Sequence, residues 1–161
     1  MPHGYRLGLP QWSEKHWIGT VFPPKTKNTD FLARYTDVFG TVEGNTTFYS
    51  EPSPETVAKW RDATPESFRF AFKLPRFVTH ELKLGEGAEV QTEHFLYRME
   101  PLGARLGPFM VQLPPSFGPR QLKALDRFLE ALPKNHCMTV ELRHPAFYAS
   151  METLGEADAL L

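Results

Sequence analysis

The sequence predicts an α/β fold built on a parallel β-sheet. Short apolar segments rich in β-branched and aromatic residues alternate with segments whose apolar residues recur every three or four positions, the pattern of strands followed by helices. Connections that enter a strand are short, whereas those that leave a strand are long and carry many aromatic residues. Because ligands bind at the carboxyl ends of the strands in parallel α/β folds, the long connections predict a site at that edge of the sheet.

Five strands are expected, each a short apolar run with turn-forming or polar residues at its end. Pro10 closes the first strand and Pro114 stops the fourth. The third has the clearest pattern, since phenylalanine recurs at every second position from Phe68 to Phe72. The expected strands are residues 5–9, 41–45, 68–73, 109–113 and 138–142.

The first two helices are predicted from their caps and their apolar spacing. Thr29 or Asp30 caps the first helix, and Gly40 allows it to stop. Ser53 caps the second, with Pro54 at the first helical position. The first helix carries an apolar stripe at 3.6-residue spacing, formed by Phe31, Leu32, Tyr35 and Val38.

Three further helices are expected to begin near Gln91, Pro119 and Ser150. Residues 11–28 and 76–90 contain glycine or proline and no regular apolar period, so both are expected to be long loops. The chain therefore alternates strand and helix from end to end, which favours parallel strands joined by helical crossovers.

Composition narrows the classes of partner. The chain has 161 residues, with 18 Lys and Arg against 19 Asp and Glu, so a net charge of -1 gives no strong signal for nucleic acid or an anionic membrane. No apolar run is long enough to span a bilayer, and the N-terminus lacks the features of a signal peptide. The single cysteine, Cys137, favours a reducing compartment, so a cytoplasmic location is expected.

Several motifs in the same order resemble the YecE-like family, a domain of unknown function numbered seventy-two. The motifs include Val-Glu-Gly-Asn-Thr-Thr-Phe-Tyr at residues 42–49 and Val-Glu-Leu-Arg-His-Pro at residues 140–145. The other matching stretches are residues 56–60, 68–76 with Thr79 and His80, 106–108, and 112–115. The resemblance covers nearly the whole chain.

The family is similar to TIM-type (β/α)₈ barrels, so the resemblance implies a TIM-type (β/α) barrel of which this chain holds about the first five strands of eight. Five strands cannot close a barrel that normally needs about 250 residues. The sequence also ends within an apparent helix at residues 159–161. We therefore expect residues 1–161 to be a single domain, truncated to the N-terminal portion of the barrel.

Strand alternation predicts which polar residues share a face. Near its end, each strand carries polar residues on one of its two faces. If these faces all point into the mouth of the barrel, five residues converge in one pocket: Glu43, Lys73, Gln112, Glu141 and Arg143. Ionisable groups that meet in a partly dry cleft shift one another's pKa values, which would give an acid and base pair. The same residues could instead close the top of the barrel as a satisfied ion-pair network.

The predicted catalytic residues are Glu43, Glu141 and Lys73, with one glutamate as general base and the other as acid or ligand. The predicted substrate-binding residues are Trp12, Asn45, Tyr49, Arg76, His80, Gln112 and Arg143. Structural alternatives stay open for both sets, since aromatic residues in long loops often pin those loops and asparagine often caps a turn. His80 and His144 lack the spacing of a metal motif, so no metal ligand is predicted.

These observations favour a small-molecule enzyme whose substrate is phosphorylated or carbohydrate-like. Two alternatives use the same residues: a non-catalytic module that binds a ligand or nucleic acid, and an inactive fragment of the full barrel. The sequence identifies no cofactor and does not give the oligomeric state.

Overall fold

The computed structural model describes residues 5–149, 155 and 157–159. They form one sheet of five parallel strands in chain order, which confirms the predicted α/β class. The first strand is shorter than expected, because only two of its residues pair with the next strand. The strands are β1 (Gly8–Leu9), β2 (Thr41–Gly44), β3 (Arg69–Lys73), β4 (Leu106–Gln112) and β5 (Met138–Glu141).

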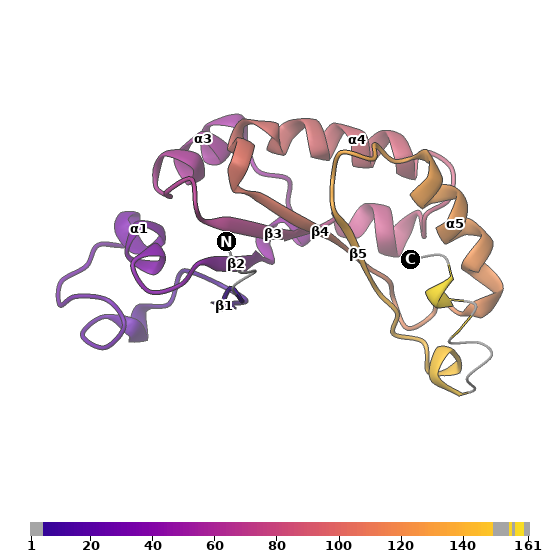
Figure 1. Ribbon diagram of the computed structural model, residues 1–161, viewed down its shortest axis with the longest axis horizontal. Helices are drawn as coiled ribbons and strands as arrows, with labels where there is room; N and C mark the ends of the chain where they lie inside the picture. The colour runs from indigo at the N-terminus through magenta and orange to yellow at the C-terminus, as the bar shows by residue number, and fades with distance from the viewer. Residues whose placement is uncertain (1–4, 150–154, 156, 160–161) are drawn as a thin grey trace.

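Figure 1 shows α3 and α4 on one side of the sheet and α5 beside β5. None of the helices in the described part of the chain is long and apolar enough to cross a membrane. The α-helices are α1 (Phe31–Thr36), α2 (Thr46–Tyr49), α3 (Pro54–Asp62), α4 (Ala88–Met99) and α5 (Leu122–Ala131). Shorter helical turns lie at Lys15–Trp17, Asn28–Asp30, Phe77–Glu81, Glu100–Arg105, Pro119–Gln121 and Pro145–Tyr148.

The structure corrects two expectations, one about the connection after β3 and one about the first helix. Residues 76–90 are not wholly loop, because Phe77–Glu81 forms a π-helical turn and α4 already begins at Ala88. The five-residue turn is too short to show an apolar period, and positive φ angles at Lys83 and Leu84 separate it from α4. Val38 is exposed and does not continue the apolar stripe expected for the first helix, because α1 ends at Thr36. The helix expected from Ser150 falls largely outside the described residues.

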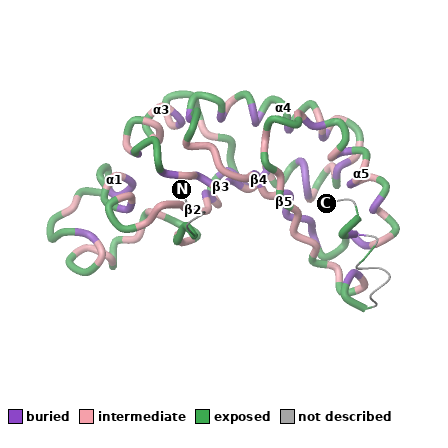
Figure 2. The backbone as a smooth tube through the Cα atoms, in the orientation of Figure 1, coloured by how far each residue is buried: buried purple, intermediate pink, exposed green. Residues whose placement is uncertain are grey.

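Side chains of opposite parity face opposite sides of the sheet. In β3, Phe70 and Phe72 are fully buried, whereas Arg69, Ala71 and Lys73 are only partly buried. β2 alternates in the same way, and Figure 2 shows buried and intermediate residues along the central strands. Alternate side chains, such as Phe70 and Phe72, therefore pack into the core beneath the helices. The side chains between them lie on the opposite face of the sheet, which no described helix covers. We call it the open face.

Aromatic rings fill the core between β3 and α3. The ring of Phe72 lies 5.4 Å from that of Phe70 and 5.7 Å from that of Trp60, both in stacked arrangements. Trp12, in the loop after β1, adds an edge contact to Trp60 at 5.5 Å. Stacked and edge-on aromatic pairs add to the free energy gained from burial, so this cluster fixes which face of β3 turns inward.

Tyr35 in α1 adds a second, side-chain connection between β1 and β2, which pair over only two residues. Its side chain is completely buried, and its hydroxyl accepts a hydrogen bond from the Leu9 N–H at 2.7 Å and donates one to the Thr41 carbonyl at 3.0 Å. Burial raises the pKa of this phenol, so the hydroxyl keeps its proton for the second bond. The short first strand is therefore joined to β2 by a side chain as well as by the sheet.

A glycine is required at the end of β2 because an aromatic ring occupies the space beside it. A Cβ atom built at Gly44 would lie 2.5 Å from the Phe72 ring. The neighbouring Gly40 has no such constraint, since the nearest atom to its Cβ would be 3.8 Å away. The position of the polar segment that follows β2 thus depends on the close contact between the Gly44 backbone and the Phe72 ring.

We predict that Tyr35→Phe lowers the free energy of unfolding by about 1–3 kcal/mol, because it leaves the Leu9 N–H and the Thr41 carbonyl without their partner. The loss is measured by urea denaturation. Tyr97→Phe is the control, since Tyr97 is exposed. Equal unfolding midpoints for the two variants would contradict the prediction.

We predict that Gly44→Ala destabilises the fold by about 1–3 kcal/mol through overlap with the Phe72 ring. Gly40→Ala, at the other end of the strand, leaves the thermal midpoint nearly unchanged. Replacing Phe72 by leucine in the Gly44→Ala background recovers part of the loss if the ring is its cause. A loss that stays the same with and without the ring would refute this explanation.

Candidate functional site

Glu43 and Lys73 meet at the carboxyl ends of β2 and β3. Glu43 is opposite Ala71 in the strand register, and Lys73 reaches back from the next position on the same face. The Lys73 Nζ atom lies 3.0 Å from a Glu43 carboxylate oxygen, with 17% of the lysine side chain and 33% of the glutamate side chain exposed. The pair is therefore half-buried at the rim of the open face.

A second ion pair lies at the end of β5. The Arg143 Nε donates to the Glu141 carboxylate at 2.5 Å. Glu141 is the register partner of Gln112 in β4, so the two residues are neighbours on the open face. Gln112 is only 6% exposed, and its Oε1 atom has no hydrogen-bond partner among the described residues.

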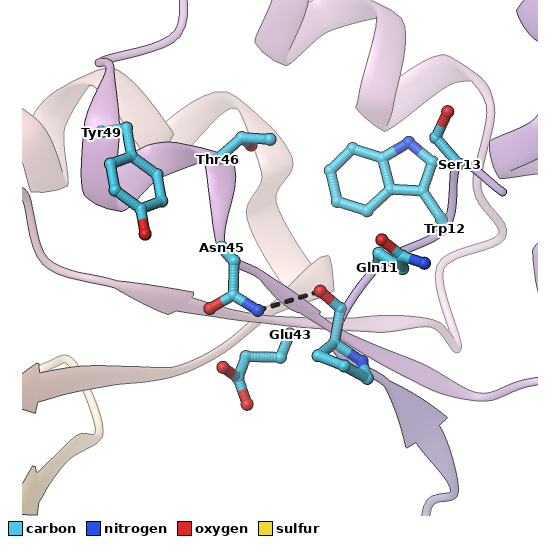
Figure 3. Close-up of a pocket in the computed structure, with 8 residues that line it drawn as sticks. Gln11, Trp12, Ser13, Glu43, Asn45, Thr46 and Tyr49 are labelled. Atoms are coloured by element: carbon cyan, nitrogen blue, oxygen red, sulfur yellow. Dashed lines mark hydrogen bonds between the residues drawn. The ribbon is translucent and has the colours of Figure 1, made fainter.

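A pocket of about 320 Å³ lies beside Glu43, between the loop after β1 and the segment after β2 (Figure 3). Asn45 holds the two walls together, because its Nδ2 donates to the Pro10 carbonyl at 2.9 Å. In Figure 3 the Asn45 side-chain oxygen and the Glu43 carboxylate lie on the same side, away from the Trp12 ring. The lining residues are Pro10, Gln11, Trp12, Ser13, Glu43, Asn45, Thr46 and Tyr49.

The two aromatic residues of this pocket have different surroundings. Trp12 is half-buried and contacts Trp60 and Phe70 in the core, so it pins its loop as well as lining the pocket. Tyr49 is 80% exposed and has only Phe48 as an aromatic neighbour. Tyr49 is therefore free to contact a ligand over much of its surface.

Thr47 fastens the segment after β2 to the sheet. Its side chain is completely buried, and its hydroxyl lies 2.9 Å from the Gly44 carbonyl and 2.8 Å from the Lys73 carbonyl. One hydroxyl hydrogen is shared between these two acceptors. The ends of β2 and β3, which carry Glu43 and Lys73, are thus held in a fixed relation.

Arg76 and His80 lie beyond β3, outside the pocket next to Glu43. Arg76 pairs with Glu81 at 2.6 Å, and it lines a second cleft of about 320 Å³. The His80 Nδ1 atom lies 2.9 Å from the Thr79 hydroxyl, and its ring packs edge-on against Phe48 at 5.1 Å. Tyr49 lines both clefts, so it stands between them.

Burial lowers the pKa of His80, and the positive charges of Arg76 and Arg143 lower it further. His80 is therefore neutral at neutral pH and lies within electrostatic reach of both arginines. His144 has a local partner instead, because its Nδ1 accepts from the Ala146 N–H at 3.0 Å. Across the described ranges, no three His, Cys, Asp or Glu side chains are grouped closely enough to hold a metal ion.

The structure thus divides the predicted residues into neighbouring groups. Trp12, Glu43, Asn45 and Tyr49 share one pocket, with Lys73 bound to its glutamate. The second group, at the ends of β4 and β5, consists of Gln112, Glu141 and Arg143. Three further lining residues were not predicted from the sequence: Gln11, Ser13 and Thr46. Their position next to Trp12 or Asn45, in segments that follow strands, could have indicated them.

The chain is similar to curated bacterial proteins. UPF0759 protein YecE of Escherichia coli (strain K12) is 44% identical over 146 residues, which cover 91% of this chain and 51% of YecE. UPF0759 protein YunF of Bacillus subtilis (strain 168) is 32% identical over 73 residues, 45% of this chain and 25% of YunF. The chain therefore spans about half the length of YecE.

Solved structures of longer proteins share the fold. A DUF72 family protein from Thermotoga maritima MSB8 matches with a TM-score of 0.74 and 32% identity, over 95% of this chain and 60% of that one. A DUF72 family protein from Enterococcus faecalis V583 matches with a TM-score of 0.70 and 27% identity, over 94% of this chain and 55% of that one.

A family model agrees with these pairwise comparisons. The model described as "Protein of unknown function DUF72" matches residues 6–160, which include every strand and every candidate site residue named above. The chain belongs to the DUF72 family.

Proposed function

We propose that this chain carries part of a small-molecule enzyme site in which Glu43 is the general base. The observation that carries the proposal is the double position of Glu43, which lines the pocket and also contacts Lys73 at 3.0 Å. A half-buried carboxylate beside a pocket can take a proton from a bound substrate. The Lys73 ammonium has further N–H groups, which can stabilise negative charge that develops on that substrate.

Glu141 is better suited to bind substrate than to transfer the same proton. It lies three strands from Glu43 in the sheet order, and adjacent strands are about 4.8 Å apart. Its carboxylate is also engaged by Arg143. In this proposal Glu43 performs the proton transfer, while Glu141, Arg143 and Gln112 orient a distal part of the substrate.

We also propose that the five strands are the first five of an eight-stranded TIM-type barrel, and that residues 1–161 are the N-terminal portion of a single domain. Two observations support this. Among the described residues, the helices that pack on the sheet lie on one face, and the similar proteins of known structure are longer than this chain. The open face would then be the barrel interior. A cytoplasmic location remains our expectation from the single cysteine.

A non-catalytic ligand-binding module is the second candidate. The ion pairs near the strand ends favour it, because each of these cations already contacts a carboxylate. The pairs are Lys73–Glu43, Arg76–Glu81 and Arg143–Glu141. Such a network can hold a ligand without any proton transfer. The same pairing leaves little free positive charge for a nucleic-acid backbone, in agreement with the net charge of -1.

We predict that Glu43→Gln abolishes turnover of a small molecule that the wild-type chain consumes from a bacterial metabolite extract. The expected loss is about 10²- to 10⁴-fold, the usual contribution of a general base. Consumption is measured by mass spectrometry on the wild-type chain and the variant. Glu93→Gln, at an exposed position on α4, is the matched control and keeps the wild-type rate.

Consumption by Glu43→Gln at the wild-type rate would remove the catalytic role. Absence of any consumed compound, together with retained ligand binding, would support the non-catalytic module instead.

We predict that His80→Gln makes stability less sensitive to acid. The folded-state pKa of His80 is lowered, so the unfolded chain binds its proton first and stability falls as the pH drops below about 6.5, the unfolded value. The loss is complete below the folded-state pKa. Urea midpoints of the wild type and the variant are compared at about pH 7 and about pH 5. The prediction fails if the wild-type midpoint does not drop more than that of the variant.

A further inference from the structure

Gln112 presents a buried acceptor that nothing in the described structure satisfies. Its side chain is 6% exposed, and its Oε1 atom makes no hydrogen bond to any described residue. A buried polar atom without a partner is unfavourable, and in native chains a bound water, ion or ligand commonly supplies that partner. Gln112 has the parity of the open face and lies at the carboxyl end of β4, where the other candidate site residues gather.

The polar groups around Gln112 include both acceptors and donors. Glu141 is its register partner in β5, and Lys73 in β3 is the register partner of Met110, two residues before Gln112 on the same face. Further along the rim, Glu43 presents a carboxylate, and the Asn45 Oδ1 makes no hydrogen bond to a described residue. A ligand that fits this surface must donate hydrogen bonds to these oxygen atoms and accept from Lys73.

The charges of the rim are already balanced. Lys73 contacts Glu43, Arg143 contacts Glu141 and Arg76 contacts Glu81. His80 adds no charge at neutral pH because burial and the two arginines lower its pKa. A phosphate group carries about -1.5 to -2 charge at pH 7 and offers only acceptor oxygens in its dianionic form. It therefore adds negative charge to a balanced rim and leaves the Gln112 Oε1 atom without a donor.

We infer that the site takes a neutral, polyhydroxylated, carbohydrate-like substrate rather than a phosphorylated one. A hydroxyl group donates to the Gln112 Oε1 atom and to the glutamates, and it can also accept from Lys73. Met110 and Ala71 supply apolar surface between these polar groups on the open face, and Tyr49 supplies an exposed ring at the rim. The inference rests on the proposed site at the strand ends and names its substrate class.

The test is an NMR titration of the ¹⁵N-labelled chain that follows the side-chain amide of Gln112. The probes are a mixture of D-glucose, D-mannose, D-galactose and D-xylose and, separately, inorganic phosphate. We expect the sugar mixture to shift the Gln112 amide signals and inorganic phosphate to leave them in place. The opposite pattern, or no shift with any of the sugars, overturns the inference.

Gln112→Leu adds a second measurement. Loss of one hydrogen bond to the ligand weakens sugar binding about tenfold. The thermal midpoint rises, because an unpartnered buried polar atom is removed. Glu93→Leu, at an exposed position on α4 that lines neither cleft, is the control and retains wild-type sugar affinity. Unchanged affinity in Gln112→Leu, or in Gln112→Met if the leucine variant does not fold, overturns the role of this residue.

The two proposals fail in different ways. Sugar binding at Gln112 with no turnover in the Glu43 experiment supports the substrate class and contradicts the catalytic role. Turnover that depends on Glu43, with a product that derives from a phosphorylated compound, supports the catalytic role and overturns the substrate class.

Discussion

The alternation of side chains along the parallel strands is the constraint on which the rest of the structure depends. Phe70 and Phe72 pack against Trp60 beneath the helices, and this contact commits the other parity of β3 to the open face. Because β2 and β4 pair with β3 in a fixed register, this contact also determines which of their side chains face the core. Glu43 and Lys73 meet because aromatic packing on the opposite face fixed the orientation of their strands.

Three small contacts convert this sheet into a defined site. The Tyr35 hydroxyl joins β1 to β2, the Thr47 hydroxyl joins the ends of β2 and β3, and Asn45 ties its own segment to the loop after β1. Each contact joins a side chain to a backbone group of a neighbouring segment. The pocket is therefore built from well-anchored segments, although residues 10–13 of its lining lie in the loop after β1.

Much of the fold could be predicted from the sequence because each element has a local signal. The period of two in β3 and the Ser53-Pro54 cap of α3 both gave the correct element type. The π-helical turn at Phe77–Glu81 has no such signal, since five residues are too few to show a helical period. Parity correctly indicated a shared face for Glu43 and Lys73. The ion-pair partners, the Asn45–Pro10 bond and the burial of Gln112 depend on side-chain conformations that spacing does not encode.

The separation of the two faces also bears on how such a chain changes over generations. Neighbouring positions in one strand answer to different requirements, because Phe72 is held by packing while Lys73 borders the pocket. Substitutions at odd and even positions of β3 therefore affect stability and chemistry almost independently. A scaffold of this kind can acquire new specificities without rebuilding its interior.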